Sequence, residues 1–205
     1  MKQFSKLILL CLLALTLLCS CDSATQSTTT KTDPFFEQLQ VRADAEYQAL
    51  TLKIVTKKAG QTLESVFDVT EMDGNSASIT YTIQQFGTFS PTNPLPENFI
   101  ETKVGQATLQ DGVITSLDGE ELSLSFSAFT TNRISFKSEY FENVEKTANG
   151  MTADIANPDG FLSGAGLVGE NAKLTVIYGP SILQSMVITY TTTDGVAVTI
   201  TYTFN

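Results

Sequence analysis

Short runs in which apolar and polar residues alternate recur along the chain. The clearest run is Val196 to Phe204, in which every even position is apolar and all odd positions but one are threonine. A period of two sends successive side chains to opposite faces of a β-strand, so that one face is buried and the other is in water. The pattern predicts strands that each present one face to a hydrophobic core.

Four earlier runs alternate in the same way, and Asp-Gly pairs separate the runs. The runs are Ile79 to Ile83, Leu122 to Phe126, Ile134 to Phe136 and Leu174 to Tyr178. The pairs are Asp73-Gly74, Asp111-Gly112, Asp118-Gly119 and Asp194-Gly195. Asp and Gly tolerate the backbone angles of tight hairpin turns, so these aspartates are interpreted as turn residues rather than catalysts. We predict a mainly β fold: an antiparallel curved sheet, half-barrel or sandwich with at most one or two short helices.

Three segments do not follow the alternation. Residues 35–45 satisfy both a helical and a strand period, so their conformation stays open, and a strand is predicted from about Tyr47. Tyr140 to Asn149 is compatible with a short helix that ends at Gly150, and the prolines of Ser90 to Pro96 predict a loop.

Two predicted hairpins resemble each other. Thr70 to Gly74 is followed by Ile79-Thr-Tyr-Thr82, and Thr191 to Gly195 is followed by Ile200-Thr-Tyr-Thr203 at the same spacing. Because nothing further along the chain repeats with them, we favour convergence on good hairpin residues over a trace of duplication.

The first 33 residues have a different composition. Lys2 and Lys6 precede an apolar stretch from Leu7 to Leu18, which is the order of parts in a secretory signal peptide. Twelve apolar positions are too few for a spanning helix, which needs about 20. The polar segment from Asp22 to Asp33 has almost nothing to bury and is predicted to be a flexible tether that reaches about 20 Å.

The residues Leu18-Cys19-Ser20-Cys21 resemble the lipobox of a bacterial lipoprotein signal peptide. In that pattern a small residue directly precedes the lipidated cysteine and an aliphatic residue stands three positions before it. Cys21 fits, because Ser20 and Leu18 occupy these positions. Cys19 does not fit, because Leu18 and Thr16 would occupy them. The resemblance implies that signal peptidase II cuts between Ser20 and Cys21, and that the Cys21 sulfur carries a diacylglyceryl group. The new amino group would receive a further acyl chain such as palmitate. An ordinary secretory signal with an incidental cysteine is the alternative.

This resemblance implies a domain organisation and a location. Residues 1–20 would be the signal peptide, residues 21–33 the lipidated cysteine and tether, and residues 34–205 a single β-rich domain. The domain would be held by lipid at the extracytoplasmic face of the bacterial cell membrane, or on the outer membrane if the source is Gram-negative. Two or three acyl chains give stable anchoring, because one chain alone is marginal.

Composition excludes several kinds of chemistry. The chain has no histidine, and Cys21 is the one cysteine left after cleavage, which excludes the usual zinc, haem and copper sites and histidine-dependent nucleophiles. The mature chain has 10 basic and 22 acidic residues, a formal charge of −12 that disfavours nucleic acid. We predict no catalytic residue, no cofactor and no metal site.

Two short motifs match functional patterns in residue spacing but not in their surrounding sequence. Gly164-Ala-Gly166-Leu-Val-Gly169 has the glycine spacing of a dinucleotide fingerprint, but Leu174 to Tyr178 after it alternates like a strand, where the fingerprint needs a helix. We interpret it as a mobile loop. Asn157-Pro-Asp159-Gly160 is similar to part of a calcium loop but lacks carboxylates at the first and last ligand positions of the EF-hand frame, so an irregular calcium site is a minor alternative.

A lipid-anchored, mostly antiparallel chain of this length resembles extracytoplasmic lipoproteins of the LolA and LppX type. The resemblance covers residues 39–205 through strand pattern and anchoring, and it implies a curved sheet around an apolar cavity, closed by helices. Few helices are predicted here, so a plain sandwich or open barrel is an equal alternative.

Three functions follow, in order of preference. The first is a non-enzymatic lipoprotein that binds an apolar or amphipathic ligand, with the membrane and a lipid as its partners. The second is an envelope structural or surface protein-interaction lipoprotein. The third is a hydrolase that uses paired carboxylates.

Overall fold

The computed structural model describes residues 33–73, 76–86, 100–110, 113–116, 134–162, 167 and 169–205. The chain divides into two units, Met1–Lys31 and Thr32–Asn205, and all the described residues belong to the second unit. The buried residues of the hydrophobic core that the structure describes lie between Phe36 and Phe204, within this second unit. None of the described helices is long and apolar enough to span a bilayer.

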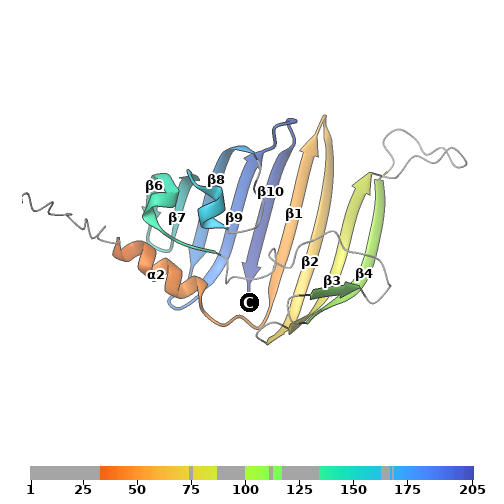
Figure 1. Cartoon of the computed structure of the whole chain (residues 1–205), viewed down its shortest axis with the longest axis horizontal. Helices are drawn as coiled ribbons and strands as arrows, with labels where there is room; N and C mark the ends of the chain where they lie inside the picture. The colour runs from red at the N-terminus through yellow and green to blue at the C-terminus, as the bar shows by residue number, and fades with distance from the viewer. Residues whose placement is uncertain are drawn as a thin grey trace, which may run out of the picture. The chain divides into compact units, whose positions relative to one another are not determined.

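The second unit is built on one antiparallel sheet of ten strands (Figure 1). The strands are β1 (Leu50–Lys58), β2 (Gln61–Asp73), β3 (Ser76–Phe86), β4 (Ile100–Gln110), β5 (Val113–Ser116), β6 (Phe141–Thr147), β7 (Gly150–Ile155), β8 (Glu170–Tyr178), β9 (Leu183–Thr191) and β10 (Ala197–Phe204). The helices are α2 (Pro34–Ala43), the 3-10 helix η3 (Ser138–Tyr140) and α3 (Pro158–Phe161). The sheet is curved and unclosed, which confirms the predicted mainly β, antiparallel fold with few helices.

The strand order shows how the sheet is assembled. From one edge to the other it runs β5-β4-β3-β2-β1-β10-β9-β8-β7-β6, which is two five-stranded meanders placed side by side. The first and last strands of the domain join them, because β1 pairs with β10 from Leu50↔Phe204 to Lys57↔Ala197. This central pair of strands therefore joins the two meanders into one sheet.

Register lines up the apolar positions of different strands in rows across the inner face of the sheet. One row contains Tyr81, Phe67, Leu52, Tyr202, Met186 and Val176, each paired with the next on a neighbouring strand. All six side chains are buried. The period-two pattern of each strand thus becomes one band of core that crosses the central pair.

Helix α2 packs against this face next to β9. Asp33 caps the helix by accepting a hydrogen bond from the Phe35 N–H at 3.0 Å, and Pro34 occupies the first turn, where its missing N–H costs nothing. Phe36, Leu39 and Ala43 are buried on one side of the helix. The open question about residues 35–45 is resolved as a helix as far as Ala43, and the strand predicted from about Tyr47 begins at Leu50.

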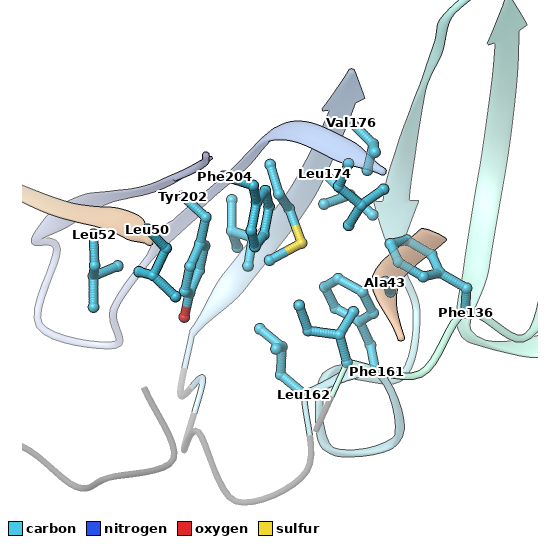
Figure 2. Packing of buried hydrophobic residues seen from close by; sticks show 14 of the residues in the cluster. Ala43, Leu50, Leu52, Phe136, Phe161, Leu162, Leu174, Val176, Tyr202 and Phe204 are labelled. Atoms are coloured by element: carbon cyan, nitrogen blue, oxygen red, sulfur yellow. The ribbon is translucent and has the colours of Figure 1, made fainter. Parts of the chain in front are cut away.

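Aromatic side chains from four segments fill the space beneath α2. The Phe36 and Phe141 rings stack with centroids 5.6 Å apart, and Phe161 lies edge-on to Phe141 at 5.1 Å and tilted to Phe136 at 5.6 Å. Figure 2 shows Phe136 and Phe161 gathered with side chains of β1, β8 and β10 in one cluster. These rings are part of the buried hydrophobic cluster on this side of the sheet.

The interpretation of Tyr140 to Asn149 as a helix is wrong, because residues 141–147 form strand β6. The strand pairs with β7 in a register that shifts between Glu142 and Glu145, and Asn143 has a φ of 50°. This bulge takes Val144 out of the period-two pattern, so the sequence lacks the alternation that identifies a strand.

The other predicted runs have mixed outcomes. The runs at Ile79–Ile83, Leu174–Tyr178 and Val196–Phe204 lie in strands β3, β8 and β10, as predicted. Ile134 makes only an isolated bridge to Leu162, although Ile134 and Phe136 are both buried. The runs and turns at Leu122–Phe126, Ser90–Pro96, Asp111-Gly112 and Asp118-Gly119 lie outside the described residues.

The two hairpins with similar sequences differ in register. Thr70 pairs with Ser78, whereas the corresponding Thr191 pairs with Ala197, because the β2–β3 pairing is irregular between Thr70 and Asp73. The strand registers next to the two turns therefore differ.

Truncation of Phe204 tests the central pair. Phe204 is buried and stacks on Tyr202 at 6.1 Å, so Phe204→Ala should lower the free energy of unfolding by about 3–5 kcal/mol in urea denaturation of residues 32–205. The control is Thr203→Ala on the opposite, exposed face, which should cost at most about 1 kcal/mol. Equal losses for the two variants would contradict the assigned faces.

Candidate functional site

Burial changes along the inner face of the sheet, row by row. A second row contains Ile83, Ser65, Ile54, Ile200, Ile188 and Leu174, paired strand to strand. Ile188 and Leu174 are buried, whereas the other four are only half-buried. In this row the side chains are thus covered over β8 and β9 and partly exposed over β10, β1, β2 and β3, whereas the neighbouring row from Tyr81 to Val176 is buried on every strand.

We call the open part the inner shelf: Ile54, Leu63, Ser65, Ile83 and Ile200. Leu63 pairs with Thr56 one step further along β1 and β2 and is also half-buried. Four of the five side chains are aliphatic. Beside the shelf, Phe67, Leu52 and Tyr202 are buried, so the shelf is a continuation of the core rather than an isolated patch.

Polar groups border the shelf at strand β4. Lys103 pairs with Ile83, and the Gln85 side chain donates a hydrogen bond to the Glu101 carboxylate at 3.1 Å. Lys103, Gln85 and Glu101 are half-buried, and Lys103 continues the row that contains Ile83. An amphipathic molecule on the shelf would meet apolar side chains first and this polar border at the edge.

Three tyrosines of the core, the buried Tyr47 and Tyr202 and the half-buried Tyr190, belong to the framework around the sheet. Desolvation raises the pKa of Tyr202 to about 12 and raises the pKa of Tyr190 as well. Tyr47 donates a hydrogen bond to the Arg42 carbonyl at 2.6 Å and accepts one from the Leu183 N–H at 2.9 Å, which ties α2 to β9. These phenols are neutral at physiological pH and belong to the framework of the site.

Grooves also lie elsewhere on the described part of the domain. One of about 480 Å³ runs between α2 and the turn at Pro180, and one of about 410 Å³ lies between residues 44–48 and Met72-Asp73. A third, of about 310 Å³, lies over β6, β7 and β8 and contains Asp154, which bonds to Asn143 at 2.7 Å and lies 3.6 Å from Lys173 Nζ. That carboxylate already has its partners.

Predicted site residues fall into two groups. Ser20 and Cys21 lie outside the described residues, as does most of the Gly164–Gly169 motif. Asn157 caps helix α3 by accepting a hydrogen bond from the Gly160 N–H at 2.9 Å, so the calcium-like motif has a structural role. Among the described residues, no three His, Cys, Asp or Glu side chains gather as metal ligands.

Asp194 lies in the predicted turn. Its carboxylate lies 2.7 Å from Lys58 Nζ and accepts a hydrogen bond from the Thr192 hydroxyl at 2.6 Å, and these two partners lower its pKa to about 2. Gly195 follows with a φ of 82°. The prediction of a turn residue is confirmed at this position.

Sequence reasoning did not find the shelf. Its side chains come from β1, β2, β3 and β10, and only the strand order places Ile200 beside Ile54. The alternation in each strand indicates which residues share a face. It does not indicate which other strand lies beside it.

Comparison with known proteins gives distant structural similarity alone. No protein-family model matches the chain, and no curated protein matches it. Among solved structures, the chain is similar to a DUF1329 family protein from Desulfovibrio piger, at 12% identity and a TM-score of 0.33, over 83% of this chain and 90% of that one. A TM-score below 0.5 does not establish a shared fold. The structural class of this protein is therefore defined by its own domain, which is a curved, unclosed sheet with an apolar inner face.

Alkaline titration tests the burial of Tyr202. The unfolded phenol has a pKa near 10.0 and the folded one about 12, so between these pH values the unfolded chain releases a proton that the folded domain retains. The phenol of Tyr202 therefore contributes to the free energy of unfolding in full below pH 10. This contribution, on the order of 2–3 kcal/mol in total, is lost as pH rises through 12. Tyr202→Phe should lose less stability than the wild type between pH 9.5 and 11.5 in urea denaturation. Identical losses would show that this phenol is not desolvated.

Proposed function

We propose that this chain is a lipid-anchored extracytoplasmic protein that binds an apolar or amphipathic ligand on the inner shelf, without catalysis. The observation that carries the proposal is the half-burial of Ile54, Ile83 and Ile200 in the same row as the buried Ile188 and Leu174. Each square ångström of apolar surface removed from water contributes about 25 cal/mol. A ligand chain on the shelf would complete the burial that α2 provides on the other half.

The dimensions of the shelf suit an extended acyl chain. Neighbouring strands lie about 4.8 Å apart, so the path from β10 across β1, β2 and β3 to β4 spans about 19 Å. Lys103 and the Gln85–Glu101 pair lie at the β4 end of that path. A ligand with an apolar chain and a polar head would find matching surfaces in the right order.

The proposed anchor explains why such a shelf would be useful. Lipidation at Cys21 and a tether of residues 22–33 would hold the domain within about 20 Å of the membrane, where lipids are abundant. The domain would then exchange a lipid or a lipid-modified partner with that membrane.

Ligand recovery tests the binding proposal. Full-length protein extracted from membranes, and residues 32–205 produced in soluble form, should both yield a stoichiometric lipid by mass spectrometry of an organic extract. Ile54→Gln should reduce recovery roughly fivefold or more, because a side-chain amide left unpaired against an acyl chain costs about 1–3 kcal/mol. The matched control is Val55→Gln, the next residue on β1, whose side chain points to the opposite face.

Two outcomes would overturn the proposal. One is a wild-type protein without any extractable apolar molecule, which would favour the surface-interaction alternative. The other is equal recovery from the Ile54 and Val55 variants, with both shown to be folded by urea denaturation.

Replacement of the lipobox cysteine tests the anchor separately. Cys21→Ser should abolish incorporation of labelled palmitate and release the protein from the membrane fraction, because the thioether cannot form. Cys19→Ser should leave both unchanged. Continued labelling of the Cys21 variant would place the modification elsewhere.

A further inference from the structure

Helix α2 has a second face, which does not pack against the hydrophobic core. Pro34, Glu37, Gln38, Val41 and Arg42 recur at steps of three and four along one face of the helix. Together with Pro180 and Ser181 of the β8–β9 turn, they line the groove of about 480 Å³. This volume lies within the range of small-molecule sites, which is about 300–1,000 Å³.

Val41 is an unusual residue for the surface of a helix. Its side chain is 70% exposed, and a β-branched residue lowers helix propensity relative to alanine or leucine. Folding therefore gains little from a valine at this position. With Pro34 and Pro180 it contributes exposed apolar surface to a groove that is also lined by polar side chains.

Arg42 brings a fixed positive charge to the groove. Its Nε donates to the Gly179 carbonyl at 3.0 Å, its Nη1 donates to the Gln38 carbonyl at 2.9 Å, and the guanidinium lies 4.8 Å from the centre of the Tyr178 ring. A guanidinium has five N–H donors. Three of them have no protein partner in the part of the chain that the structure describes. Such a held guanidinium is well suited to bind a phosphate oxygen.

Glu37 brings the opposite charge, about 7–8 Å away along the helix axis, which is five residues of 1.5 Å rise. The groove thus offers a carboxylate, exposed apolar surface and a guanidinium. An anionic ligand would match only Arg42, and the formal charge of −12 on the mature chain repels it further. A zwitterionic ligand matches both charges.

We infer that this groove binds the head group of a zwitterionic phospholipid, with its phosphate on Arg42, its ammonium beside Glu37 and its glycerol region against Val41. This occupant follows from charge complementarity and from the position of the groove. Pro34 lines the groove and follows directly on the proposed tether, so the groove is the part of the folded domain nearest in sequence to the proposed anchor at Cys21. A tether of this length gives an effective concentration in the millimolar range, so a weak site is sufficient.

Nuclear magnetic resonance titration of residues 32–205 tests the site without the anchor. Dihexanoylphosphatidylcholine, kept below its micelle-forming concentration, should shift the amide signals of Val41, Arg42 and Ser181 in a saturable manner. Val41→Asp should weaken binding at least about fivefold, because a carboxylate would face the apolar part of the ligand. The matched control is Val104→Asp, since Val104 is equally exposed, at 75%, but lies on β4.

Each other outcome decides against the inference. Equal shifts with inorganic phosphate alone would show a simple anion site, and stronger binding of dihexanoylphosphatidylglycerol would exclude zwitterionic selectivity. Shifts only at Ile54 and Ile200 would support the inner shelf as a lipid site and overturn the groove. No saturable shift at α2 would overturn the groove and leave the proposed function untouched.

Discussion

The pairing of β1 with β10 is the constraint on which the rest of the domain depends. It joins the first strand to the last and makes one ten-stranded sheet from two five-stranded meanders. An unpaired strand edge exposes its N–H and C=O groups, and two separate meanders would leave both central edges open. The pair also carries the apolar rows across the middle, since Leu52 meets Tyr202 and Ile54 meets Ile200.

The two halves of the inner face then have different fates. Over β8 and β9, helix α2 and the phenylalanine cluster around Phe141 complete the core. The row that contains the buried Ile188 continues over β10, β1, β2 and β3, where its side chains are half-buried. The proposed acyl chain would lie along this half-buried row and so extend a core that already exists. The two proposed lipid contacts differ in kind, since the shelf would hold an acyl chain and the α2 groove would hold a head group.

The fold was largely predictable because each strand carries its own alternation. The run from Val196 to Phe204 and the Asp194-Gly195 turn were assigned correctly from local pattern alone. Residues 35–45 satisfied two periods at once, and the deciding signal was Asp33-Pro34, a capping residue followed by proline at the first helical position. Strand β6 was missed because the bulge at Asn143 breaks its alternation. The candidate sites were not predictable, since Ile54 meets Ile200 and Arg42 meets Gly179 only through pairing of distant segments.

Site-specific photo-crosslinking tests the central claim most directly. p-Benzoylphenylalanine placed at residue 54 or at residue 55 probes opposite faces of the same strand at the same level of the sheet. In full-length protein in its native membrane, we expect irradiation to attach a lipid to the probe at position 54, on the inner shelf, and not to the probe at position 55. Equal lipid attachment at both positions, or attachment only at position 55, would contradict the assignment of the inner shelf as the ligand site.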